Sequence, residues 1–199
     1  MAKANVRERL LEAGLETLHR RGFNGCGVQE IASTAGVPKG SFYNHFESKE
    51  ELGAAVIGRY WEQRAGSALR LLQEPEFSPR ERLRRYFSAL ADKMGKRAYA
   101  GGCLIGNLGA ELSDQSELIR VGVEAAFSGW VKALELCIRE GQSGGEIRAD
   151  FDAAALASFL INAWEGAILR AKVVKNSAPL EEFKQIVFGN LLASTEKRP

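Results

Sequence analysis

The chain has 199 residues, of which 45% are hydrophobic and 26% are charged, and its mean hydropathy is −0.19. This composition is typical of a globular protein with one or two domains, and it argues against a disordered chain and against a large multidomain enzyme. With 27 Lys and Arg against 25 Asp and Glu, the formal net charge is only +2. That charge is too small for a protein that coats nucleic acid or membranes indiscriminately, so any contact with nucleic acid must be a local patch.

The three cysteines, Cys26, Cys103 and Cys137, are odd in number and widely spaced. Neither a disulfide framework nor a CxxC metal site is predicted from them, and the sequence indicates no metal and no cofactor. The first nine residues lack the apolar stretch of a signal peptide, and no apolar run approaches the ~20 residues that cross a bilayer. We therefore expect a cytoplasmic protein that does not associate with membranes.

Helical periodicity recurs along the whole chain, whereas alternating β-branched runs closed by tight turns are missing, which predicts an all-α fold of about nine helices. A first amphipathic helix is expected to end at Gly22, because glycine adopts the left-handed conformation easily. Two short helices are predicted over Val28–Ala35 and Lys39–Phe46. Pro38 starts the second of them and keeps the preceding residue extended, so a tight turn joins the two.

Ser48 and Glu51 form a capping box, which predicts a fourth helix that continues to about Leu72. Ser78-Pro79-Arg80-Glu81 is a second strong start signal. The remaining helices are expected at roughly 80–96, 103–112, 114–141, 152–175 and 179–194. The glycine-rich stretch 141–145 marks the clearest break between long helices.

The third helix has the residue pattern of a helix that reads DNA. Phe42 and Phe46 are four residues apart and are expected to face inward, so the opposite face carries polar and cationic side chains suited to phosphates and base edges. Lys49 would bring a positive charge to a phosphate at the start of the next helix. The full set of candidate DNA contacts is Gln29, Lys39, Gly40, Ser41, Tyr43, Asn44, His45 and Lys49. The alternative is an amphipathic surface helix of an unrelated bundle.

These residues carry a family resemblance. The stretch Gly22-Phe23 … Val28-Gln29-Glu30-Ile31-Ala32 … Ala35-Gly36-Val37-Pro38-Lys39-Gly40-Ser41-Phe42-Tyr43-Asn44-His45-Phe46-Glu47-Ser48-Lys49-Glu50-Glu51-Leu52 closely resembles the TetR family of bacterial transcriptional regulators. The resemblance implies a helix-turn-helix DNA-binding domain over 1–47, a connecting helix over 48–72, and an effector-binding and dimerisation domain over 73–199. It implies a homodimeric repressor of operator DNA, with Tyr43 and Lys49 on phosphates. Cys26-Gly27 departs from the family, which usually carries Thr or Ser there as a helix cap.

The stretch 99–112 begins a helix with glycines and puts the thiol of Cys103 in its first turn, where the helix dipole lowers a thiol pKa. Together with residues 164–172, this stretch is similar to a TetR subgroup that responds to electrophiles and oxidants through a cysteine. The similarity implies that Cys103 is the trigger and that Lys172 lies beside it. The alternatives are an inert buried thiol and a noncovalent small-molecule effector. The residues proposed to line its pocket, which could equally be packing residues, are Tyr99, Asn107, Phe127, Trp130 and Trp164.

Two further alternatives remain open. The small residues of the helix over 152–175 suit either an interface between two copies of the chain or an intramolecular core. The N-terminal helices could also merely imitate a DNA reader in an all-α enzyme or small-molecule-binding protein. Catalysis would need a converging nucleophile, base and orienting group, and the only histidines are His19 and His45, so no catalytic residues are predicted.

Overall fold

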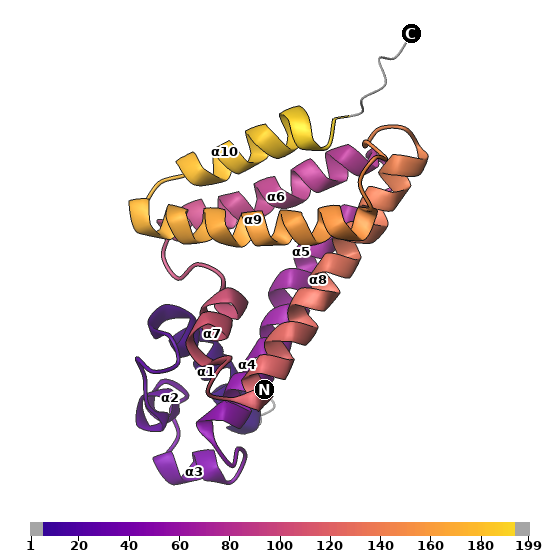
Figure 1. Cartoon of the computed structure of the whole chain (residues 1–199). Helices are drawn as coiled ribbons and strands as arrows, with labels where there is room; N and C mark the ends of the chain where they lie inside the picture. The colour runs from indigo at the N-terminus through magenta and orange to yellow at the C-terminus, as the bar shows by residue number, and fades with distance from the viewer. Residues whose placement is uncertain (1–5, 194–199) are drawn as a thin grey trace. The chain divides into compact units, whose positions relative to one another are not determined.

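The computed structural model describes residues 6–193, except for the side chains of residues 64–67, and every regular element in that range is helical (Figure 1). The prediction of an all-α fold is confirmed. The helices form two compact units that are discontinuous along the chain. The first unit runs up to Gln63 and includes Cys103–Phe127, and the second comprises Arg64–Gly102 and the chain from Ser128 onward. No helix within residues 6–193 is both long enough and apolar enough to span a membrane.

The first unit is built around α1. Its helices are α1 (Val6–Arg21), α2 (Val28–Thr34), α3 (Lys39–Tyr43), α4 (Lys49–Tyr60), α7 (Leu104–Leu112) and the beginning of α8 (Glu117–Ser143). Gly14 of α1 faces α4, where an added Cβ would lie 3.0 Å from a methyl group of Leu52. The side chains of Leu10, Ile31 and Phe42 are fully buried between these helices. The apolar stripe expected on the first helix is thus its packing face.

The turns that orient α2 and α3 agree with the sequence signals. Gly22 (φ +77°) follows the end of α1, and Gly36 (φ +65°) follows the end of α2. The Gly36 N–H donates to Ser33 O and the Val37 N–H donates to Ala32 O, each at 3.0 Å. This pair of bonds is a Schellman motif, which stops α2 and turns the chain into α3.

The capping box at α4 has a modified form. The Ser48 hydroxyl accepts a bond from the Glu51 N–H at 3.1 Å, as predicted. The Glu51 carboxylate accepts from the Glu47 N–H at 2.6 Å rather than from the Ser48 N–H. Beyond α4 the helical run continues through a π-helical turn (Trp61–Ala65), α5 (Gly66–Leu69) and a 3-10 turn (Arg70–Gln73), so the single predicted helix changes type along its length.

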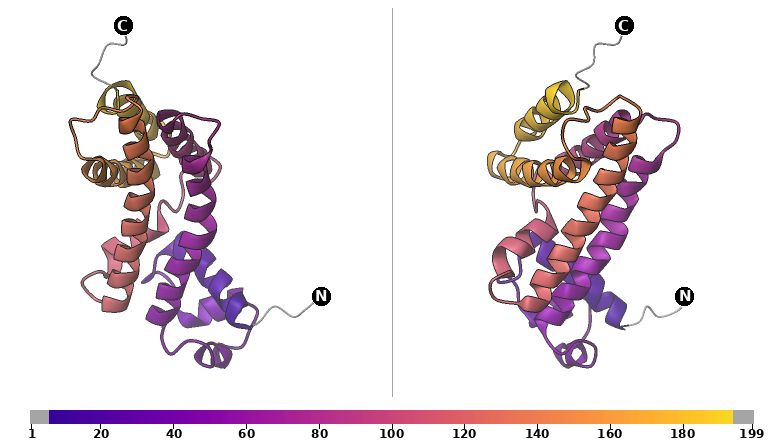
Figure 2. Two further views of the ribbon diagram at one scale, coloured as in Figure 1. Left: turned by 90° about the vertical axis from the view of Figure 1, so that its right-hand side faces the viewer. Right: turned by 45° about the vertical axis from the view of Figure 1, so that its right-hand side comes forward.

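The second unit contains α6 (Pro79–Gly95), the rest of α8, α9 (Ala153–Val174), α10 (Ala178–Ile186) and a final π-helical turn (Val187–Leu191). Figure 2 shows α9 and α10 lying side by side. The rings of Phe87, Trp164 and Phe183 meet in the core, with centroids 4.9–5.1 Å apart. Arg82 ties α6 to α8, because its guanidinium donates to Glu140 at 2.7 and 3.1 Å.

One detail of this unit differs from what the sequence predicts, and another bears on an open alternative. Ser78 precedes α6 as expected, but its side chain makes no capping bond, and the Glu81 carboxylate pairs with Arg84 at 2.7 Å instead. On α9 four of the eight Ala and Gly residues lie in the intramolecular core: Ala153, Ala157, Ala167 and Ala171 are all buried. A Cβ at Gly166 would meet no atom within 4 Å, so this glycine faces outward.

The end of α8 lies directly against the loop that follows it. A Cβ on Gly141 would lie 2.6 Å from Cδ1 and 2.8 Å from Cγ1 of the buried Ile147. Gly141→Ala is therefore expected to lower the free energy of unfolding by about 1–3 kcal/mol through overpacking. Gly144→Ala is the matched control, because the nearest atom to its Cβ is 3.5 Å away. Denaturant unfolding of both variants measures the difference, and equal midpoints would contradict this account of the packing.

Candidate nucleic-acid interface

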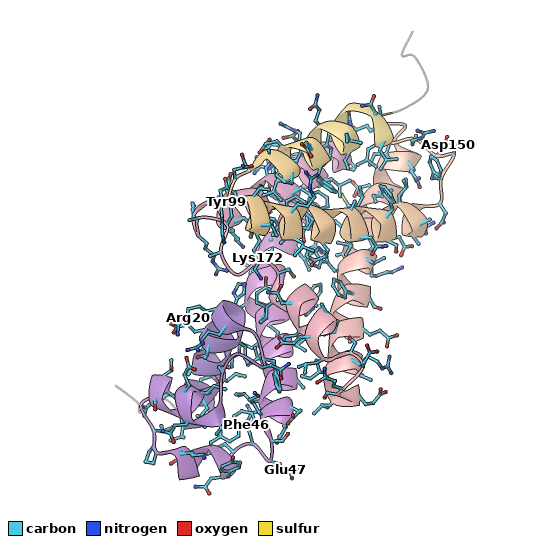
Figure 3. All side chains as sticks on the ribbon, turned by 60° about the vertical axis from the view of Figure 1, so that its left-hand side comes forward. Arg20, Phe46, Glu47, Tyr99, Asp150 and Lys172 are labelled. Atoms are coloured by element: carbon cyan, nitrogen blue, oxygen red, sulfur yellow. The ribbon has the colours of Figure 1, made fainter. Side chains whose placement is uncertain are left out.

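The outer face of α2 and α3 exposes most of the predicted DNA contacts. Phe42 and Phe46 are buried beneath α3, as predicted, and they anchor it to the first unit. Gln29, Lys39, Gly40, Tyr43 and Asn44 are exposed, and Ser41 and His45 are half-buried. Figure 3 shows Phe46 among the helices and Glu47 at their outer edge. Helix α3 ends at Tyr43, three residues earlier than predicted, so Asn44 and His45 lie in the turn that follows.

Tyr43 is the large exposed side chain of this face. It is 56% exposed, and its ring meets the ring of Phe42 edge-on with the centroids 5.2 Å apart. The edge contact holds the ring in place while the rest of the side chain remains open to solvent. An aromatic hydroxyl held in this way suits a hydrogen bond to a phosphate oxygen.

Two arginines of α1 contact the helix-turn-helix, and neither was predicted from the sequence. Nη2 of Arg9 donates to the carbonyl oxygens of Ala35 at 2.5 Å and Gly36 at 2.8 Å, so it caps the end of α2. The guanidinium of the exposed Arg7 lies 5.1 Å from the centre of the Phe46 ring. Arg7 therefore adds a cation beside α3. No local sequence signal distinguishes these arginines from the others on α1.

Lys49 is placed differently from the other candidates. Its Nζ donates to the carbonyl oxygens of Phe23 and Cys26, each at 2.9 Å, and lies 4.0 Å from the centre of the Phe23 ring. An ammonium group has three donors, so one remains for a phosphate. The contact of Lys49 with phosphate stays a prediction, and its bonds to the loop before α2 are a structural role that the sequence did not reveal.

The candidate effector residues are divided between the two units. Cys103, Asn107 and Phe127 belong to the first unit, and Trp130, Trp164 and Lys172 belong to the second. Figure 3 places Tyr99, which follows α6, at the same end of α9 as Lys172 within the second unit. Trp164 is fully buried, and its Nε1 donor has no partner among the residues described. A buried donor left in this state is costly unless something accepts from it.

Cys103 lies at the N-cap of α7, one residue before the position predicted. Its side chain is only 5% exposed and makes no capping bond to the amides of the helix. The other two thiols are also buried, and burial raises the pKa of both. The pKa of Cys137 is raised to about 12, and its Sγ lies 3.3 Å from the carbonyl oxygen of Pro79. Burial is the main cause for Cys26 as well, and the neighbouring Lys49 opposes it.

A short exposed helix held by a Schellman turn, with cations and hydrogen-bonding side chains outward, defines a helix-turn-helix DNA-binding regulator. Comparison with known families agrees. The family model described as "Bacterial regulatory proteins, tetR family" matches residues 10–56, and the model "Tetracyclin repressor-like, C-terminal domain" matches residues 79–187. The chain belongs to the TetR family of transcriptional regulators, which confirms the resemblance seen in the sequence.

Several relatives match over nearly their full length. The chain is 43% identical to the HTH-type transcriptional repressor DhaR of Mycobacterium sp. (strain GP1), covering 98% of this chain and 97% of that protein. It is 33% identical to the HTH-type transcriptional repressor NemR of Escherichia coli (strain K12), covering 89% of each. Among solved structures, a regulatory protein TetR from Rhodobacter sphaeroides has a TM-score of 0.88 at 35% identity, covering 96% of this chain and 100% of the other. The reduced form of E. coli NemR has a TM-score of 0.88 at 31% identity, covering 98% and 100%.

Proposed function

We propose that this regulator is a homodimeric repressor that binds a pseudo-palindromic operator through α3 and leaves it when an effector binds or modifies the protein. The observation that carries the proposal is the exposed polar and cationic face of α3 above its buried Phe42 and Phe46 anchors. Relatives named as repressors support the direction of regulation. On this proposal the protein works in the cytoplasm and is not an enzyme.

The second unit offers a surface for pairing two copies. The exposed positions of α9 recur every three or four residues along one side: Ala155, Phe159, Asn162, Gly166, Leu169 and Val173. Phe159, Leu169 and Val173 are 55–72% exposed, which is unusual for three large apolar side chains on one stripe. Apart from Asn162 these residues are apolar or small, and a seven-residue spacing of such residues is what a helix presents to a partner helix. We propose that this stripe, together with the exposed Ile186 of α10, forms a two-fold interface.

The DNA-binding proposal is tested by Lys39→Ala. Phosphate contacts release counterions, so removing one cation from the interface is expected to weaken binding to all DNA sequences. The slope of the logarithm of the binding constant against the logarithm of the salt concentration should become shallower by about 1. Lys132→Ala removes the same charge from α8 in the second unit, where Lys132 pairs with Glu135, and is the control. Fluorescence anisotropy with labelled upstream DNA at several salt concentrations gives both quantities. Equal affinities and slopes for the two variants would overturn the assignment of Lys39.

For the effector we propose that the Cys103 thiol reacts with an electrophile and that the modified protein leaves the operator. A crystal structure of the relative NemR from E. coli holds the protein in a reduced form, which supports redox chemistry in that relative. The noncovalent alternative rests on the unpaired Nε1 of Trp164, which could donate to a polar atom of a bound ligand.

N-ethylmaleimide, which adds to a thiolate sulfur, tests whether the Cys103 thiol is the trigger. The Cys103→Ser variant is expected to bind operator like the unmodified protein and to remain bound after treatment, whereas Cys26→Ser and Cys137→Ser should still be released. If Cys103→Ser is released as readily as the unmodified protein, Cys103 is not the trigger and another thiol, such as Cys26, is the site of reaction. If N-ethylmaleimide does not release even the unmodified protein, the noncovalent ligand becomes the better proposal.

A further inference from the structure

The loop between α1 and α2 is held from outside by a carboxylate of α7. The Glu111 side chain accepts hydrogen bonds from the backbone N–H groups of Phe23 at 2.8 Å and Asn24 at 2.6 Å. These residues are 88 and 87 positions apart from Glu111 in the sequence. All of them belong to the first unit. The contact therefore joins α7 to the segment that leads into the helix-turn-helix.

The backbone at this point is shaped to receive an anion. Gly22 adopts φ +77°, and the next two N–H groups then point toward the same carboxylate. Successive N–H groups after such a turn form a concave site for negatively charged oxygen atoms, and hydrogen bonds to an ionised acceptor are stronger than neutral ones. A Cβ at Gly22 would lie 3.0 Å from Oε2 of Glu111, so a side chain at this position would crowd the carboxylate.

The carbonyl groups of the same loop are held by the opposite charge. Nζ of Lys49, on α4, donates to the carbonyl oxygens of Phe23 and Cys26. The Phe23 ring lies beneath that ammonium group and against Gly53 of α4, where an added Cβ would be 3.3 Å from Cε2. The Glu111 carboxylate of α7 thus holds backbone N–H groups of this loop, and the Lys49 ammonium group of α4 holds its carbonyl groups. The loop leads directly into Gly27, the N-cap residue of α2.

We infer that Glu111 is a positioning residue for DNA binding: it holds the start of α2, and with it α3, in the orientation that the operator requires. Helix α7 is itself located by Gly109, where an added Cβ would lie 3.1 Å from Val123 of α8. On this inference Glu111 acts through the loop and not through a contact of its own with DNA. The inference rests on the proposed DNA-binding function, and the test below separates the two.

The test is the pair Glu111→Gln and Glu111→Ala, with Glu117→Gln as the matched control. Glu117 is an exposed acid of the same unit that pairs with Arg120 at 2.6 Å. Removing a negative charge should by itself strengthen binding to DNA. The control is expected to bind operator as well as the unmodified protein or better. Glu111→Ala is expected to weaken operator binding by about tenfold, because the charge-assisted bonds to the loop are lost. The affinity of Glu111→Gln is expected to lie between that of Glu111→Ala and that of the unmodified protein.

Two further readouts distinguish positioning from general destabilisation. The salt slope of operator binding should be the same in the Glu111 variants as in the unmodified protein, since no phosphate contact is removed. In nitrogen-proton correlation spectra the amide signals of Phe23 and Asn24 should move upfield, and their hydrogen exchange should become faster, while the amides of Leu10 and Leu18 in α1 stay unchanged.

The outcomes separate the inference from the function on which it rests. If the unmodified protein binds no operator, the proposed function fails, and the amide measurements alone decide whether Glu111 holds the loop. If the unmodified protein binds operator and both Glu111 variants bind it equally well, the inference is overturned. Unchanged amide signals of Phe23 and Asn24 in Glu111→Ala would also overturn it.

Discussion

Replacing Phe42 with alanine is expected to abolish operator binding by unfolding the helix-turn-helix. The Phe42 side chain is 0% exposed, and its ring packs against Phe46 with the centroids 5.7 Å apart. Truncating a buried phenylalanine lowers the free energy of unfolding by about 3–5 kcal/mol, through lost transfer energy and the cavity that remains. Because the free energy of unfolding of a whole domain is only about 5–15 kcal/mol, this loss removes much of the stability of the unit that carries α3.

Tyr43→Ala is the matched control, because it truncates the adjacent aromatic residue on the opposite, exposed face of the same helix. We expect the free energy of unfolding to change by less than about 1 kcal/mol in Tyr43→Ala, since exposed substitutions have small effects. Operator affinity should nevertheless fall. Thermal unfolding followed by circular dichroism and anisotropy titrations on both variants provide the comparison. If Phe42→Ala melts at the temperature of the unmodified protein, the position of α3 on the core is wrong.

The Cys137 thiol is expected to react with iodoacetamide about a thousand times more slowly than an unperturbed thiol at pH 8, because only the thiolate reacts. Its pKa is raised by burial from 9.0 to about 12. At pH 8 a thiol with a pKa of 9 is about one-tenth ionised, whereas one with a pKa near 12 is about one ten-thousandth ionised. Since the pKa of Cys137 in the folded protein lies well above pH 9, the labelling rate should rise about tenfold per pH unit between pH 7 and pH 9.

Mass spectrometry of the labelled protein at pH 7, 8 and 9 measures the rate at each cysteine. Cys26 should also be slow, because burial raises its pKa in the same direction. Denatured protein is the control, in which all three thiols should react at similar rates. Labelling of Cys137 in the native protein as fast as in the denatured protein would contradict the burial described here. Slow reaction at Cys26 and Cys137 would also mean that any rapid response to electrophiles comes from Cys103.

The sequence by itself determined the elements whose signals are local. Gly22 and Gly36 end helices through backbone hydrogen bonds, and Ser48 begins one through its side-chain hydroxyl. These bonds reach only a few residues along the chain, so the neighbouring residues suffice to predict them. The inward Phe42 and Phe46 follow from helical spacing alone. The same short motif carried the family resemblance, which comparison with known proteins confirms.

Only the tertiary structure decided which distant groups meet. Glu111 binds the loop before α2 across 88 positions, Arg9 caps α2 from α1, and Lys49 turns toward carbonyl groups of the protein. The first unit combines the N-terminal helices with Cys103–Phe127. No change in composition along the chain predicts this grouping. The functional boundaries at 47 and 72 therefore stay predictions. A carboxylate or an ammonium group finds its partner through the packing of whole helices, and helix periodicity states which face is buried but not which segment covers it.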